Sequence, residues 1–149
     1  MQGDYVGNIR NKRTYLYDGE SLINNINMKI EQYNQNDDMI IYIQNAAKGK
    51  KSELVNGLSI VSNLVYEKQK ASCFSNSELT ACLIENKIAS IELVGVDGNY
   101  CVGLSALEGA KLGFNVKLNL ECVGIANPER FVKMKARLLN AGIAINDAL

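Results

Sequence analysis

The sequence contains no histidine, and its four cysteines stand singly, without a C-x-x-C pair. Zinc sites are usually built from Cys and His ligands at short spacings, so a zinc site of this kind is not expected. We therefore expect neither a metal nor a cofactor. The cysteines are Cys73, Cys82, Cys101 and Cys122.

Net charge and long apolar runs are lacking too. Sixteen basic residues balance sixteen acidic ones, so neither nucleic acid nor a membrane is an expected partner. The short cluster of Lys48, Lys50 and Lys51 is interpreted as a solvated loop. No apolar run approaches the roughly 20 residues that span a bilayer, and the polar stretch from Gln2 to Thr14 is not a signal peptide. The cysteines are therefore interpreted as reduced thiols of a cytoplasmic protein.

The composition itself is ordinary. Hydrophobic residues make up 47% of the 149 residues and charged residues 21%, which is typical of a globular chain that buries a core. We expect a single domain over residues 1–149.

Apolar strand patterns alternate with helical patterns along the chain. Such alternation indicates parallel β-α-β units, so we expect an α/β fold with three α-β-α layers and an open, Rossmann-like parallel sheet. The functional crevice of such sheets lies beyond the carboxyl ends of the strands, which places Lys68 and the turn 97–101 at the working edge. The expected strands are 39–44, 63–68, 90–96, 115–120 and 143–145, and the expected helices are 18–34, 75–87, 101–112 and 127–142.

The stretch "VGVDGNYCVGLSALEG" carries candidate chemistry. A strong strand runs into a tight turn that delivers Cys101 at a helix start. The unpaired N–H groups and positive partial charge of a helix N-terminus favour a thiolate and can hold an oxyanion, and a nearby lysine acts in the same direction. The competing interpretation is a buried cysteine that serves as a small hydrophobe. It is favoured for Cys73, Cys82 and Cys122.

Two segments resemble the isochorismatase-like cysteine hydrolases. The first is "GVDGNYCVGLSALEGAKLGFNV", which has the strand ending in Gly-Val, a short turn, a Cys, a small-residue helix with Ser-Ala, and Gly-aromatic-x-Val. The second is "EKQKASCFSNSEL", which is similar to the family's Lys-x-x-x-Ser-x-Phe stretch, at Lys68, Ser72 and Phe74. Because both occur in order on the expected α/β frame, the match is specific.

The resemblance implies an Asp-Lys-Cys catalytic triad. Cys101 is then the nucleophile, Lys68 favours its thiolate, and a cis peptide bond after Val96 helps to aim backbone N–H groups at the oxyanion. Taken alone, Lys68 reads as a solvated surface lysine and Phe74 as core. The implied sites are catalytic Cys101 and Lys68, the turn residues Val96, Asp97 and Tyr100, and the substrate-pocket residues Gln2, Phe74 and Tyr100.

The opening "MQGDYVGN" matches the family's segment just after its first strand. The resemblance places the catalytic Asp directly before Met1, and the first strand before that; Asp4 is too far along to substitute. A sheet without its central strand forgoes the burial of apolar residues worth about 1.5–3 kcal/mol each. Either Met1 is internal to a longer protein, or the sequence is a fragment, or it is a short form that has lost catalysis. The first two are favoured because Lys68 and Cys101 are present.

The leading hypothesis is a metal-independent cysteine hydrolase of a small amide or other C–N bond, acting through a Cys101 thioester and impaired without the Asp. The alternative is a non-catalytic module that binds a small molecule or a protein. A nucleotide or flavin binder is disfavoured because no G-x-G-x-x-G or P-loop follows a strand, and a nicotinamidase because those relatives usually carry a His-rich metal site. The resemblance also suggests a homodimer or higher homo-oligomer.

Overall fold

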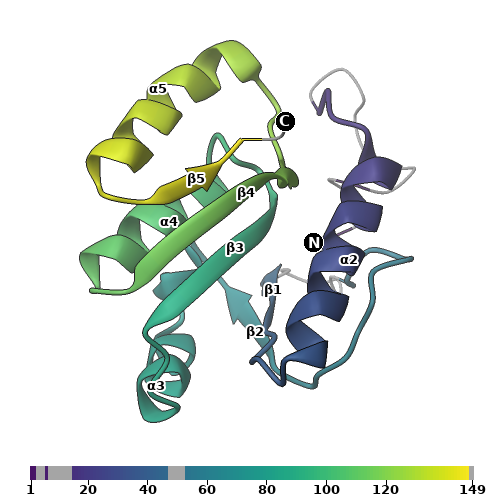
Figure 1. Ribbon diagram of the computed structural model, residues 1–149, viewed down its shortest axis with the longest axis vertical. Coiled ribbons are helices and arrows are strands. Elements are labelled where there is room, and N and C mark those ends of the chain that lie inside the picture. The colour runs from purple at the N-terminus through teal and green to yellow at the C-terminus, as the bar shows by residue number, and fades with distance from the viewer. Residues whose placement is uncertain (3–5, 7–14, 47–52, 148–149) are drawn as a thin grey trace.

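The computed structural model describes residues 1–2, 6, 15–46 and 53–147. Asp4 and the lysine cluster at 48–51 lie outside them. In chain order (Figure 1) the elements are α2 (Gly19–Gln35), β1 (Tyr42–Asn45), β2 (Val65–Lys68), the 3₁₀ turn η1 (Cys73–Ser75), α3 (Ser77–Glu85), β3 (Ser90–Val96), α4 (Cys101–Lys111), β4 (Asn115–Gly124), α5 (Pro128–Asn140) and β5 (Ala144–Asn146). No described helix is long and apolar enough to cross a membrane.

The helices begin and end where the sequence marks them. The side chains of Asp18, Asn76 and Asn127 accept hydrogen bonds from the first turns of α2, α3 and α5, as N-cap residues do. Gly113 and Gly142 follow α4 and α5 with φ of +98° and +79°, a backbone conformation that glycine adopts without steric cost. These boundaries therefore follow from local chemistry.

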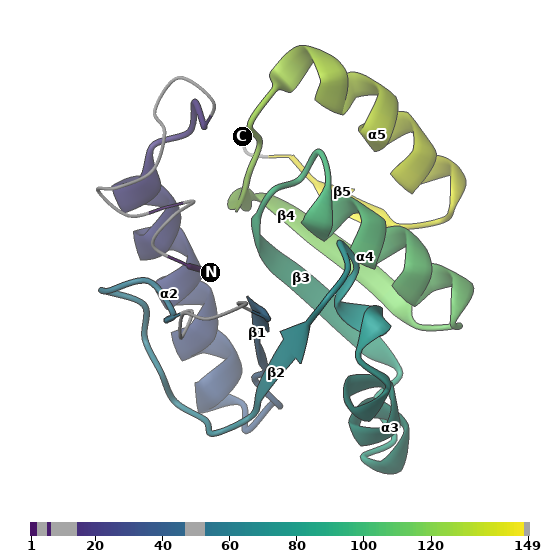
Figure 2. The same ribbon diagram turned by 180° about the vertical axis from the view of Figure 1, so that it is seen from behind.

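All the strand pairs of the two named sheets are parallel, which confirms the α/β fold. β1 pairs with β2, and β3, β4 and β5 form a second sheet in that order. Figures 1 and 2 show α2 on one face of β3 and β4, with α4 and α5 on the opposite face. The three-layer arrangement directs the carboxyl ends of β2 and β3 toward the same edge.

Two apolar clusters hold α2, α4 and α5 onto the second sheet. On one face Ala106 of α4 and Leu138 of α5 pack against Leu118 of β4, and all three are almost fully buried. On the other face Ile26 of α2 packs near Cys122 of β4. β4 thus contributes buried side chains to both faces, as expected of a strand covered by helices on both sides.

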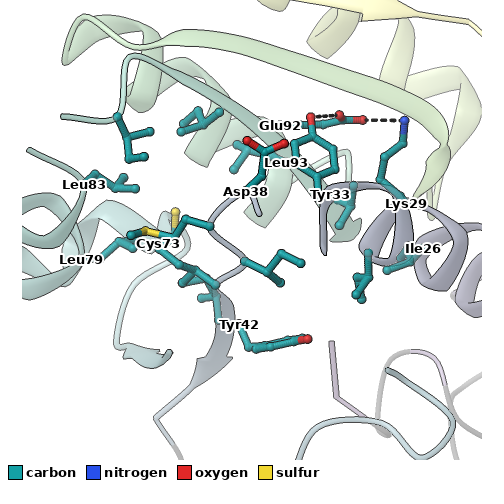
Figure 3. Close-up of a pocket in the computed structure, with 18 of the residues that line it drawn as sticks. Ile26, Lys29, Tyr33, Asp38, Tyr42, Cys73, Leu79, Leu83, Glu92 and Leu93 are labelled. Atoms are coloured by element: carbon teal, nitrogen blue, oxygen red, sulfur yellow. Dashed lines mark hydrogen bonds and ion pairs between the residues drawn. The ribbon is translucent and has the colours of Figure 1, made fainter. Parts of the chain in front are cut away.

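The sheet is broken between β1 and β3. In the described part of the chain these strands belong to separate sheets, and a cavity of about 280 Å³ is lined by both of them, by α2 and by α3. We call it the interstrand slot (Figure 3). It lies between the two sheets, beside α2.

Candidate active site

The turn between β3 and α4 is organised by Asp97. Its backbone carbonyl accepts hydrogen bonds from Tyr100 N (3.1 Å) and Val102 N (2.9 Å), and its Oδ1 accepts one from Asn99 N (2.9 Å). These bonds fold the chain back tightly, so that α4 begins at Cys101 immediately after the turn. The cysteine therefore occupies the first helical position, as the sequence predicted.

The turn is also anchored from outside. The peptide bond between Val96 and Asp97 is cis, at the position where the resemblance implies one. The Asn99 side chain donates to Asn127 O (2.8 Å) and accepts from Asn127 N (3.0 Å). This reciprocal pair ties the turn to the residue that caps α5.

The start of α4 packs closely on the turn and on η1. A Cβ on Gly103 would lie 2.5 Å from the carbonyl oxygen of Gly98, a distance that only a glycine permits. Ser105 is buried; its hydroxyl donates to Cys101 O (2.7 Å) and accepts from Cys73 N (2.9 Å). Backbone and side-chain contacts thus fix the first turn of α4 and, with it, the position of the Cys101 sulfur.

Lys68 ends β2 and points at that sulfur. Its Nζ donates to Ala71 O (2.8 Å), to Lys70 O (3.2 Å) and to Cys101 Sγ (3.4 Å). Two carbonyl groups hold the ammonium in place beside the thiol. Lys68 is therefore a bonded lysine and not a freely solvated one, and its catalytic role stays a prediction.

A cavity of about 610 Å³ opens in front of the sulfur. Gln2 is buried on its wall, and its Oε1 accepts a hydrogen bond from Asn45 N (3.1 Å). Tyr100 is 59% exposed at the rim. The cavity brings together every predicted site residue except Phe74, namely Cys101, Lys68, Val96, Asp97, Tyr100 and Gln2.

Phe74 belongs to the core instead. It is buried, its ring stacks on Phe114 at 5.8 Å between centroids, and it packs against Gly109 of α4, where a Cβ would lie 3.0 Å from the ring. The 3₁₀ turn η1 directs the ring toward this glycine and away from the cavity. Phe74 is not among the residues that line this cavity, but it lines the interstrand slot, and its predicted role in a substrate pocket stays a prediction.

Other cavity residues were not predicted. Asn45 ends β1 at the same edge as Lys68, and the strand-end rule could have found it. The amino group of Met1 also lies here; burial, together with the charge of Lys68, lowers the pKa of this amine to about 6. No local pattern in the sequence signals that the terminal amine is buried.

The family follows from comparison with known proteins. The Isochorismatase domain model matches residues 1–147, so the chain belongs to the isochorismatase family. No curated protein sequence matches it.

Solved structures share the fold. An isochorismatase-like hydrolase from Alkaliphilus metalliredigens has a TM-score of 0.82 at 22% identity, covering 98% of this chain and 89% of its own. The N-carbamoylsarcosine amidase of Thermoplasma acidophilum has a TM-score of 0.82 at 16% identity, and the match covers 99% of this chain and 91% of the amidase. The pyrazinamidase of Pyrococcus horikoshii, in complex with zinc, has a TM-score of 0.77 at 20% identity, and the match covers 99% of this chain and 95% of the pyrazinamidase.

A zinc site like that of the pyrazinamidase complex finds no support in the residues present. The chain has no histidine. Within the described ranges, no three His, Cys, Asp or Glu side chains gather closely enough to hold a metal ion.

Proposed function

We propose that the chain is a metal-independent cysteine hydrolase that cleaves the C–N bond of a small amide or related compound. The observation that carries the proposal is the 3.4 Å contact between Lys68 Nζ and Cys101 Sγ at the start of α4, facing a cavity of about 610 Å³. A nucleophile, a fixed cation and a helix N-terminus at one point form an arrangement suited to acyl transfer. Two of the structural neighbours are named as amidases.

The proposed reaction has two stages. The Cys101 thiolate attacks the carbonyl carbon, and the oxyanion accepts a hydrogen bond from Cys101 N–H, a group that has no partner among the described residues. The C–N bond breaks, the nitrogen leaves with the proton that the thiol gave up, and a thioester remains. Water then attacks the thioester, which releases a carboxylic acid and regenerates the thiol.

Proton transfer should limit the rate at which this chain hydrolyses an amide. Asp97 is the one carboxylate among the residues that line the cavity, and its Oδ1 already accepts from Asn99 N and Ala126 N. The resemblance assigns the proton to an Asp directly before Met1. Because a positioned acid or base contributes roughly 10²–10⁴-fold to rate, we expect the 149-residue chain to turn over slowly.

The same observation supports an alternative. A cavity with a positioned thiol and ammonium, and no free carboxylate on its described walls, can bind a small molecule or a protein without turning it over. In that case a ligand raises the melting temperature and no product forms.

Turnover is tested on two forms of the chain, the 149 residues and a form that carries an apolar strand ending in Asp before Met1, against a panel of small amides and N-carbamoyl compounds. We expect product from the longer form at a rate at least about 100-fold above the shorter. The Cys101→Ala variant should lose all turnover and keep its melting temperature, whereas Cys82→Ala, a half-buried cysteine on α3, should keep both.

Intact-mass measurement after rapid quenching should detect an acyl adduct on the Cys101 peptide. Turnover that persists in Cys101→Ala would exclude the cysteine mechanism. Ligand-induced stabilisation without product in both forms would support the binding module instead.

A further inference from the structure

A second lysine lines the cavity of about 610 Å³ in front of Cys101. Lys70 lies on the loop between β2 and η1, two residues after Lys68. We propose that Lys70 binds a carboxylate of the substrate, so that the amides cleaved here are short anions that carry a carboxylate close to the C–N bond. This assignment rests on the proposed function for the reaction, and it adds the chemical class of the substrate.

The other charged groups of the cavity are used within the chain. The ammonium of Lys68 is held by two carbonyl groups beside Cys101 Sγ. The carboxylate of Asp97 accepts hydrogen bonds from two backbone N–H groups through its Oδ1, at 2.9 and 3.2 Å. Burial and the charge of Lys68 lower the pKa of the Met1 amine to about 6, so this amine carries little charge at pH 7. The ammonium of Lys70 therefore remains for a ligand.

Lys70 is placed to act beside the nucleophile. Its carbonyl oxygen lies 3.2 Å from Lys68 Nζ, and the same nitrogen lies 3.4 Å from Cys101 Sγ. Its side chain is exposed, and its ammonium forms no hydrogen bond or ion pair within the ranges that the structure describes. A carboxylate at Lys70 and a carbonyl carbon at the sulfur can therefore belong to one short molecule.

A buried amide supplies a second donor on the same wall. Gln2 is 6% exposed, and its Oε1 accepts a hydrogen bond from Asn45 N (3.1 Å). This bond makes Nε2 the free end of the side chain, and Nε2 donates to no group in the described part of the chain. A buried donor without a partner is unfavourable, so an oxygen of a ligand in the cavity would stabilise it.

The cavity wall thus offers donors where it lacks free acceptors. The carbonyl oxygens of Lys70 and Ala71 accept from Lys68, and the side-chain oxygen of Gln2 accepts from a backbone amide. A carboxylate only accepts hydrogen bonds, and its bonds to a charged donor are stronger than those of a neutral group. A cationic ligand would be repelled by the two ammonium groups. These walls therefore select an anion over a neutral or cationic amide.

The monoamide of a short dicarboxylic acid has the required chemistry, and succinamate is its simplest probe. Water adds across its C–N bond, and the products are a dicarboxylate and ammonia. Succinamide is the matched neutral compound, because an amide replaces the carboxylate and the chain length is unchanged. The pair separates recognition of the charge from recognition of the amide that breaks.

The first test is independent of hydrolysis and uses the 149-residue chain. Iodoacetate and iodoacetamide both alkylate a thiolate, so the ratio of their rates at the Cys101 peptide, followed by mass spectrometry, does not depend on the fraction of thiolate. We expect Lys70→Gln to lower the ratio of the iodoacetate rate to the iodoacetamide rate about threefold. Lys70→Arg should retain the ratio, as should Lys111→Gln at the exposed end of α4. Salt at about 1 M should remove the effect of Lys70.

The second test compares hydrolysis of the two amides by both forms of the chain. We expect kcat/KM for succinamate to exceed that for succinamide at least about threefold, after correction for the two amides of succinamide, and Lys70→Gln to abolish this preference mainly through KM.

Three outcomes decide between the two proposals. An alkylation ratio that is the same with and without Lys70, or a Cys101 thiol that neither reagent reaches, overturns the carboxylate site. Hydrolysis of both amides at equal rates overturns the substrate class and leaves the hydrolase activity. A ratio that depends on Lys70, with no amide hydrolysed by either form, supports the anion site and contradicts the hydrolase activity.

Discussion

At the scale of single residues, Lys68 shows how surroundings decide a role. In the sequence it resembles any surface lysine, and only the family pattern selects it. In the structure two carbonyls hold its Nζ at 3.4 Å from Cys101 Sγ. Its charge should therefore favour the reactive form of the thiol.

We expect Lys68→Met to slow alkylation of Cys101 by iodoacetamide at pH 7 about tenfold, because the thiolate loses its neighbouring cation. The assay is clean in a Cys82→Ala background, since burial raises the pKa of the thiols of Cys73 and Cys122. Lys111→Met, at the exposed end of α4, is the charge-matched control and should leave the rate unchanged. An unchanged rate in Lys68→Met would remove the proposed role.

The site residues were predictable to different degrees. Cys101 follows from the strand-turn-helix pattern alone, because its position depends on neighbours in sequence. Lys68 and Gln2 needed the family resemblance, since they meet Cys101 only through the tertiary fold. Phe74 lies in the 3₁₀ turn η1, which the pattern does not reveal and which directs its ring onto Phe114 and Gly109. The burial of the Met1 amine has no local signal at all.

At the scale of elements, the contact of α4 with its preceding turn is the tightest in the site. We predict that Gly103→Ala destabilises the protein by about 1–3 kcal/mol, because the new Cβ would lie 2.5 Å from a backbone carbonyl and 3.0 Å from Met134. Urea unfolding of both proteins measures the difference in their free energy of unfolding. The intrinsic helix preference of alanine acts in the opposite direction, so a stabilised variant would show that the turn moves freely.

The control for Gly103→Ala is Ala81→Ser, which adds an atom at an exposed position of α3 and should change stability by less than about 0.5 kcal/mol. Alkylation of Cys101 provides a second readout. A turn displaced by the clash should change that rate in Gly103→Ala and leave it unchanged in the control.

Element boundaries divide in the same way. The ends of α2, α3 and α5 were predictable because caps and glycines act locally. β1 begins at Tyr42 instead of Met39 because its partner β2 begins only at Val65, opposite Tyr42. β4 continues to Gly124, past its predicted end, because it follows the edge of β3 through an irregular register. The ends of a strand depend on the partner with which it pairs, and the residue pattern of one strand does not specify that partner.

At the scale of the whole molecule, the parallel α/β fold was predictable because strand and helix patterns alternate along the sequence. The separation of β1 and β2 from β3, β4 and β5 was not, because it depends on which strand edges pair in the folded chain. The same separation places the amino group of Met1 beside Lys68, with its nitrogen 3.5 Å from Ile43 O. A buried amine beside a cation is costly when protonated. The global stability should therefore respond to the protonation of a single terminal group.

This response is open to measurement because the chain has no histidine. The folded pKa of the Met1 amine is about 6 and its ordinary value is 8.0, so the unfolded state binds more protons between these values. The free energy of unfolding should rise by about 2 kcal/mol from pH 6 to pH 8, and this stability should be lost again as the pH falls toward 6. Chemical denaturation at each pH measures it.

Acetylation of the Met1 amine supplies the control. The acetylated nitrogen keeps an N–H for the Ile43 carbonyl and loses the titrating group, so the slope between pH 6 and 8 should disappear. A slope that survives acetylation would assign the effect to another group. Above pH 9 both forms should lose stability alike as the buried Cys73 thiol, whose pKa burial raises, ionises on unfolding.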